Sequence, residues 1–254
     1  MSGTRSHSRT EQVTEPSRKV LLVAFGSPSD PDPQEQATRQ LADAVAHRLP
    51  GWTIGSATLA KRGSLQSAIA DLGDPIIYPF FMAQGFILEK MLMPRVRKAG
   101  LTVLRPFGVE PALVDHAAMV VERTLKQNGM NASSATVIVA AHGSAICQPS
   151  QDSAQAFASA LQERLALKAC RCGFLEQEPF ISDAVAGVEN AICLTFFNLK
   201  AGHVLSDIPK ALDAAGFNGP VIDAFVTWPE TAELIAHSLT SQSQHFEAAA
   251  LATA

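Results

Sequence analysis

The amino-acid sequence predicts an α/β fold made of two similar flavodoxin-like or Rossmann-like lobes, each with a mainly parallel sheet flanked by helices. Strand-like apolar runs alternate with helix-like segments along the chain, which is the pattern of parallel sheets covered by helices. The pattern occurs twice, because LLVAFGS and FFMAQGFILEKMLMP in the first half are matched by VIVAAHGS and FFNLKAGHVLSDIP in the second. A repeated order of elements with repeated motifs favours two lobes.

The repeat has a constant spacing that places two phenylalanines opposite two histidines. Phe25 corresponds to His142 and Phe86 to His203, and both pairs are 117 residues apart (142 − 25 and 203 − 86). Domains of this size suit a chain of 254 residues. We expect a flexible polar arm over 1–18, a first lobe over 19–130, a second lobe over 135–240 and a tail over 241–254, with the Asn-, Gly- and Ser-rich segment QNGMNASS at the lobe boundary.

The elements of the two lobes are expected in the same order. The continuous apolar run VLLVAFG after Lys19 is typical of a strand buried on both faces. The remaining strands of the first lobe are expected at 52–57, 76–81 and 102–106, and its helices at 34–49, 64–72 and 111–127. In the second lobe, strands are expected at 136–141, 169–175, 191–197 and 221–224, and helices at 151–165, 181–188, 207–215 and 230–239.

Composition excludes several classes of protein. Hydrophobic residues make up 47% of the chain, which is enough for two cores, and the net charge of −4 comes without a basic stripe interleaved with aromatic residues, so we expect no nucleic-acid partner. Neither a secretory signal nor a membrane span is evident, and we expect a soluble, cytoplasmic protein. The internal duplication can replace a homodimer, so a monomer or weak dimer is expected. The four cysteines lack CxxC spacing and are interpreted as free thiols: Cys147, Cys170, Cys172 and Cys193.

Both histidines of the second lobe follow predicted strands. His142 comes directly after the strand 136–141, and His203 follows the strand 191–197 and opens onto a helix. Loops of this kind line the carboxyl edge of an open parallel sheet, where ligands bind. Two neutral imidazoles at one edge suit a borderline divalent ion such as Fe²⁺, Co²⁺ or Ni²⁺ and leave coordination positions open. Each histidine alone also fits a purely structural role.

Acidic residues join the histidines in the second lobe only. Glu176 and Glu178 follow the strand 169–175, and at an offset of 116 residues they correspond to Ala60 and Arg62 in the first lobe. A carboxylate beside two histidines could complete a metal site or accept protons. The alternative for each glutamate is a solvated loop charge.

The first lobe has basic residues instead of acids near the matching loops. As a group facing a cleft they would suit a substrate with several carboxylates, although any one of them is also explained as a solvated surface charge. These residues are Lys61, Arg62, Lys90, Arg95, Arg97, Lys98 and Arg105. Other chemistries are poorly supported: Ser144 has no G-x-S-x-G elbow around it, and no G-x-G-x-x-G dinucleotide motif is present.

VAAHGS, FLEQEP and FNLKAGHVLSDIP together resemble the class II tetrapyrrole chelatases, specifically the long, internally duplicated sirohydrochlorin chelatases of siroheme and cobalamin synthesis. The resemblance covers the chain from Lys19 to about Leu239. It implies ATP-independent insertion of a divalent metal into sirohydrochlorin, with His142 and His203 as metal ligands and proton acceptors and Glu176 as the assisting acid. No tightly bound cofactor is implied, since the metal is a substrate.

The first lobe departs from the family pattern, because phenylalanines replace its histidines. We expect this lobe to bind the macrocycle, with Phe25 and Phe86 stacking on the ring or merely filling vacated pockets. Ser144, Arg62 and Arg95 are further candidate substrate contacts. The absence of a histidine-rich tract favours Fe²⁺, which makes siroheme, over Co²⁺, which makes a cobalamin precursor. A non-catalytic metal or tetrapyrrole carrier is the alternative from another class.

Overall fold

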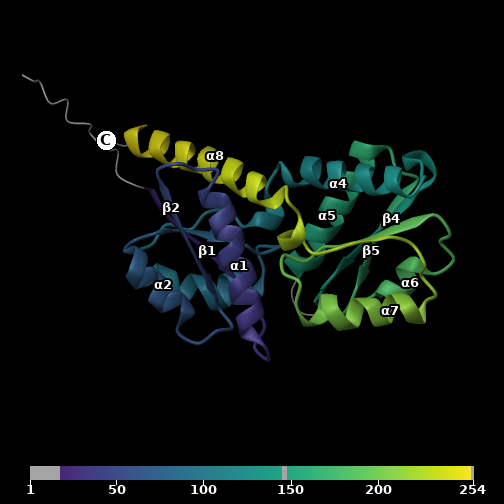
Figure 1. The fold of residues 1–254 in the computed structure, drawn as a ribbon, viewed down its shortest axis with the longest axis horizontal. Coiled ribbons are helices and arrows are strands. Elements are labelled where there is room, and N and C mark those ends of the chain that lie inside the picture. Colours follow the sequence, from purple (N-terminus) through teal and green to yellow (C-terminus); the bar gives the residue numbers. More distant parts are fainter. Residues whose placement is uncertain (1–17, 145–147, 253–254) are drawn as a thin grey trace, which may run out of the picture.

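The computed structural model describes residues 18–144 and 148–252, and it contains two α/β lobes side by side (Figure 1). The first lobe has a three-stranded parallel sheet of order β2-β1-β3. Its elements are β1 (Arg18–Ala24), α1 (Pro31–Ala46), β2 (Trp52–Thr58), α2 (Ser64–Leu72), β3 (Ile76–Pro79), the π-helix η1 (Ile87–Leu92), α3 (Met93–Arg97), the 3-10 helix η2 (Phe107–Val109) and α4 (Leu113–Gln127). Of the expected arm, only Arg18 lies within the described residues, and it begins β1.

The second lobe has a four-stranded parallel sheet of order β5-β4-β6-β7. After a short 3-10 turn, η3 (Ala132–Ser134), its elements are β4 (Thr136–Ala141), α5 (Gln148–Leu165), β5 (Ala169–Phe174), α6 (Ile181–Val185), β6 (Ala191–Thr195), the π-helix η4 (His203–Asp207), α7 (Ile208–Ala214), β7 (Val221–Ile222), the 3-10 helix η5 (Phe225–Thr227) and α8 (Thr231–Ala252). The predicted fold class is therefore confirmed.

Strands β1 and β4, each with a parallel neighbour on both sides, are almost entirely buried. Every residue of β4 is buried, and so are the last five residues of β1, because helices cover both faces of these strands. The internal repeat also extends to irregular features. A π-helix follows the third strand of each lobe, and Gly26 and Gly143, which are 117 residues apart, both have positive φ angles of 85° and 70°. The two lobes thus share these two loop features as well as the spatial order of their first three strands.

The expected fourth strand of the first lobe, 102–106, is reduced to a single bridge between Ile77 and Val103. Two local features end the pairing. The backbone N–H of Arg105 donates to Gln242 Oε1 at 2.9 Å instead of to a strand, and Pro106 has no N–H to donate. The expectation of a strand over 102–106 was therefore wrong.

The last helix is much longer than expected. The sequence pattern ended it at Leu239 and left 241–254 as a tail, whereas α8 continues to Ala252. Its continuation is explained by packing on the first lobe, since α8 contacts α1 and Gln242 of α8 is buried. Apolar surface supplied by another part of the chain thus stabilises a segment whose own amphipathic pattern is weak.

The helix that follows each sheet packs against the other lobe. Figure 1 shows α8 lying along the first lobe and α4 beside α5 of the second lobe, and both pairs of helices are in contact, α1 with α8 and α4 with α5. One apolar cluster accordingly contains residues of both sheets. The division of the chain at 19–130 and 135–240 stays a prediction, and the packing crosses that division in both directions.

Over the part of the chain that the structure describes, we find no helix that combines the length and the apolar character needed to cross a bilayer.

Candidate functional site

The structure brings His142 and His203 together at the carboxyl edge of the second sheet. His142 directly follows β4, and His203 is the first residue of η4, which follows β6. Their ring centroids are 4.9 Å apart and the rings meet edge to face at 87°. The side chains are 41% and 47% exposed, so the pair is open to an incoming ligand.

Hydrogen bonds fix which ring nitrogen each histidine presents. His142 Nδ1 lies 2.9 Å from the carbonyl oxygen of Gly143, and His203 Nδ1 lies 2.7 Å from Asp207 Oδ2. A carbonyl oxygen and a carboxylate can only accept, so we assign the proton of each neutral ring to Nδ1. Both imidazoles then present the lone pair of Nε2, which can bind a metal ion or accept a proton.

Glu176 is near His142, whereas Glu178 is not paired with either histidine. Glu176 follows β5, its N–H donates to the carbonyl of His142 at 3.2 Å, and its Oε2 lies 3.6 Å from His142 Nδ1. Glu178 is exposed, and within the described parts of the chain it forms no ion pair. Of the two glutamates that the sequence placed near the histidines, the structure thus places only Glu176 beside one of them.

The site is an open one with two imidazoles rather than a closed metal cage. Among the side chains that the structure describes, those of residues 18–144 and 148–243, no group of three His, Cys, Asp or Glu is arranged to hold a metal ion. Two imidazoles with carboxylates behind them leave coordination positions free for the nitrogen atoms of a second ligand. This arrangement suits a metal ion that is passed on rather than stored.

Asp207 was not predicted as a site residue, although it is the direct hydrogen-bond partner of His203. The pKa of Asp207 lies below its usual value, chiefly because of the hydrogen bond with His203 and then because of the Ser206 hydroxyl. The spacing of four residues between His203 and Asp207 was the available signal. A second missed residue, Phe197, has its ring 6.3 Å from that of His142 and 6.4 Å from that of His203.

The loop that carries His203 is tied to the first lobe. Asn198 Nδ2 donates to the carbonyl of Phe80 at the end of β3, and Gln34 Nε2 of α1 lies 3.5 Å from the carbonyl of Lys200. Both contacts cross between the lobes. The first lobe therefore helps to position a histidine that belongs to the second, which sequence patterns within one lobe did not indicate.

The predicted substrate contacts lie at several places. Phe86 precedes η1 and is 55% exposed, whereas Phe25 follows β1 and is partly buried against the core of the first lobe. Ser144, next to the histidine loop, donates its backbone N–H to Gln177 Oε1 at 2.6 Å. Arg62 and Arg95 are exposed on the first lobe. Their contacts with a substrate stay a prediction.

Two other members of the basic group form ion pairs within the first lobe. Lys61 Nζ lies 2.9 Å from Asp32 Oδ1, and Arg105 Nη2 lies 3.8 Å from Glu110 Oε2. Lys90, Arg97 and Lys98 are exposed.

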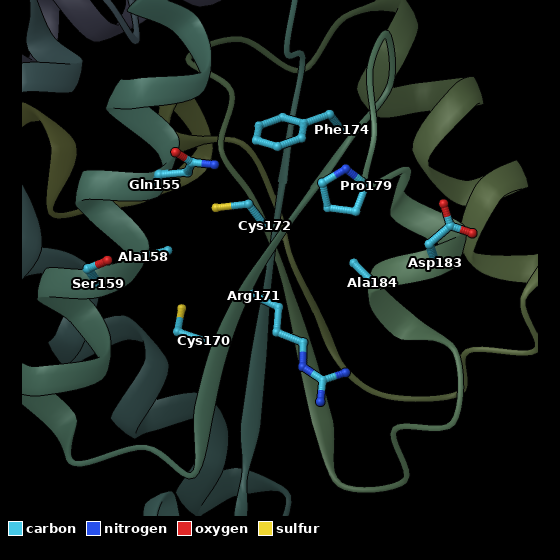
Figure 2. Close-up of a pocket in the computed structure, with 10 residues that line it drawn as sticks. All are labelled: Gln155, Ala158, Ser159, Cys170, Arg171, Cys172, Phe174, Pro179, Asp183 and Ala184. Carbon is cyan, nitrogen blue, oxygen red and sulfur yellow. The ribbon is translucent and has the colours of Figure 1, made fainter.

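A cavity of about 540 Å³ lies beside the edge strand β5, and neither histidine lines it (Figure 2). The sulfur atoms of Cys170 and Cys172 point toward α5, while Arg171 extends to the other side of the strand. Burial raises the pKa of Cys170 to about 12 and that of Cys172 to about 11, so both thiols stay protonated at neutral pH. Cys170, Cys172 and Cys193 are free, as expected, and Cys147 lies outside the described residues.

Comparison with known proteins finds relatives of the chain. The family model CbiX matches residues 136–240, which include both histidines. The structure of CbiX, the terminal enzyme for biosynthesis of siroheme in denitrifying bacteria, is 36% identical, with a TM-score of 0.81 over 88% of this chain and 99% of that chain. No curated protein matches the chain.

More distant structures share the fold. SirB from Bacillus subtilis with Fe³⁺ is 14% identical, with a TM-score of 0.71 over 91% of this chain and 98% of that chain. DR2241 from Deinococcus radiodurans, a multi-domain protein with structural similarity to chelatases, is 19% identical, with a TM-score of 0.69 over 90% of this chain and 55% of that chain. The 36% identity to CbiX over nearly the whole chain, with the match to the CbiX family model, shows that the protein belongs to the CbiX/SirB family of class II sirohydrochlorin chelatases.

Proposed function

We propose that this protein inserts Fe²⁺ into sirohydrochlorin to form siroheme, without ATP, and that His142 and His203 carry out the reaction. The observation that carries the proposal is the pair of imidazoles, 4.9 Å apart, whose Nδ1 atoms both face hydrogen-bond acceptors. This leaves two Nε2 lone pairs for the reaction. Membership of the chelatase family and the identity to a siroheme-forming enzyme support the choice of substrate.

The proposed mechanism divides the reaction between binding and proton transfer. The ring binds between the lobes, and the imidazoles hold the metal ion at one face of the macrocycle. As the metal ion leaves the two Nε2 atoms and bonds to the pyrrole nitrogens, two pyrrole N–H bonds break, and the two protons pass to the freed Nε2 atoms and on to solvent. The carboxylate of Glu176, with Oε2 3.6 Å from His142 Nδ1, assists by accepting or relaying a proton. One divalent metal ion replaces two protons, so the exchange is balanced in charge and consumes no ATP.

The first lobe is proposed to bind the macrocycle. An exposed phenyl ring such as that of Phe86 offers an apolar face for stacking, and Phe25 occupies the position of the other missing histidine. Exposed guanidinium groups, Arg62 and Arg95, suit the carboxylates around the ring, and Ser144 lies beside the histidine loop. Imidazole ligands accept Co²⁺ as well as Fe²⁺, so cobalt insertion for cobalamin synthesis is the alternative reaction.

The test is metal insertion by the purified chain, followed by the absorbance of sirohydrochlorin with Fe²⁺ and with Co²⁺. We expect His142→Ala and His203→Ala each to lower the enzyme-dependent rate by about 100-fold or more. His47→Ala is the matched control, because His47 is exposed at the end of α1. Near-normal rates in both site variants would overturn the proposal. Stoichiometric binding without turnover by the unmodified chain would identify a carrier instead.

A further inference from the structure

The two histidines of the site are held in different ways. The Nδ1 partner of His142 is a backbone carbonyl, that of Gly143, whereas the partner of His203 is a side chain, that of Asp207. The orientation of His142 is therefore set by the backbone of its own loop. The orientation of His203 depends on a carboxylate that a mutation can remove.

Asp207 is itself held in place. One carboxylate oxygen, Oδ2, lies 2.7 Å from His203 Nδ1, and the other, Oδ1, lies 3.1 Å from the hydroxyl of Ser206. The Ser206 hydroxyl also lies 2.8 Å from the carbonyl of Gly202, directly before the π-helix. A carboxylate with both oxygen atoms engaged has a defined orientation, as the outer partner of a metal-binding imidazole requires.

The first lobe lacks this arrangement at the matching position. Counting 117 residues back, Asp207 corresponds to Lys90, just as His203 corresponds to Phe86. Both lobes form a π-helix here, η1 and η4, so the helix itself requires neither the histidine nor the acid. The carboxylate is present only in the lobe that has an imidazole for it to contact.

We propose that Asp207 is a positioning residue for His203: it accepts the Nδ1–H, which keeps the lone pair of Nε2 directed into the space shared with His142. The role of the Nε2 atom in metal insertion rests on the proposed function, but the effect of Asp207 on the imidazole does not. An imidazole without this partner exchanges between tautomers and rotates, and it then presents Nε2 to the metal for only part of the time.

The first measurement reads the tautomer directly. The full chain, labelled with ¹⁵N-histidine and free of metal, is studied by long-range ¹H–¹⁵N NMR, with the His203 signals identified by their absence in His203→Ala. We expect the Nδ1–H tautomer in the unmodified protein and a mixture or the opposite tautomer in Asp207→Ala and Asp207→Asn. Asp213→Asn is the matched control, because it removes the same charge from an exposed position on α7.

The second measurement is the affinity for Co²⁺ alone, titrated by its visible absorption, together with the rate of metal insertion. In Asp207→Ala both should fall by about 10- to 100-fold, while Asp213→Asn leaves them unchanged and Asp207→Glu restores part of the loss. An unchanged tautomer in Asp207→Ala, or an unchanged Co²⁺ affinity, overturns the proposal. A tautomer that shifts as expected in a protein that never turns over sirohydrochlorin would support the positioning role and contradict the proposed function.

Discussion

Gln177 occupies the space into which a side chain on Gly143 would extend. A Cβ atom at Gly143 would lie 2.8 Å from Gln177 Cγ and 2.8 Å from Phe174 Cβ, closer than real Cβ contacts occur. Gln177 also accepts the N–H of Ser144 at 2.6 Å. The loop that follows His142 is thus held against the end of β5 with no room for a larger residue.

Gly143→Ala should therefore disturb the site as well as the fold. Its φ of +70° is unfavourable for alanine, at a cost of about 1–2 kcal/mol, and the close contacts add about 1–3 kcal/mol of overpacking. Displacement of His142 should lower metal insertion by 10-fold or more. Denaturant unfolding and the absorbance assay measure the two effects.

Gly187→Ala is the control, because Gly187 has a similar φ of +68° but no atom of the described residues within 4 Å of an added Cβ. It should show only the cost of the backbone conformation and retain full activity. Equal losses of stability in the two variants would mean that the contact with Gln177 is unimportant.

Glu176→Gln and Glu178→Gln separate the two acids of the FLEQEP motif. Of these two glutamates, only Glu176 forms an ion pair with a site imidazole within the described residues, with Oε2 3.6 Å from His142 Nδ1. Its replacement should lower the rate of metal insertion by about 10-fold without loss of stability, whereas Glu178→Gln should leave the rate unchanged. Similar losses in both variants would assign the effect to the overall charge of the loop, and the assay of initial rates decides.

Phe86→Ala tests whether the first lobe binds the macrocycle. Because the phenyl ring is 55% exposed, its removal should change the free energy of unfolding by no more than about 0.5 kcal/mol. Loss of stacking should raise the KM for sirohydrochlorin by about 3- to 10-fold and change kcat less. Met119→Ala, which truncates a side chain on α4 that is 47% exposed, is the control. A reduced kcat with an unchanged KM would contradict a binding role.

Glu110 should make folding stability depend on pH. This carboxyl is 7% exposed and accepts a hydrogen bond from Gln242, and burial raises its pKa above the ordinary 4.5. The folded protein therefore retains a proton that the unfolded chain has already lost, so the contribution of Glu110 to stability falls as pH rises through its folded pKa. Glu110→Gln keeps the acceptor without the charge.

Thermal unfolding of Glu110→Gln and the unmodified protein should show a larger gain in Tm for the variant at pH 7.5 than at pH 4. A gain that is the same at both pH values would exclude ionisation of Glu110 as its cause. Glu122→Gln, at an exposed position on α4, should show neither a gain in Tm nor a dependence of Tm gain on pH.

The sequence predicted what depends on short patterns within one lobe. Continuous apolar runs identified β1 and β4, and the rule that parallel strands end at one edge of a sheet placed His142 near His203. Contacts between distant segments could not be predicted in this way. The loss of the strand at 102–106 depends on Gln242, and the support of the His203 loop depends on Gln34 and Asn198.

Side-chain partners within loops were also beyond the sequence. Gln177 lies between the acids Glu176 and Glu178, and nothing in its spacing indicates that it packs under Gly143. Asp207 has the spacing of a helical partner of His203, but that pairing is one of several that a helix allows.

The position of α8 has a consequence for how the chain is made. The hydrogen bond between Arg105 and Gln242 joins residues 137 positions apart, so the half that leaves the ribosome first must wait for the last helix before its packing is complete. Until then Glu110 lacks its amide partner and the face of α1 that contacts α8 is uncovered. A chain divided between the two lobes would therefore not give two halves that are each fully packed. Each fragment would carry a helix that packs on the other, and the packing of both would be complete only after they associate.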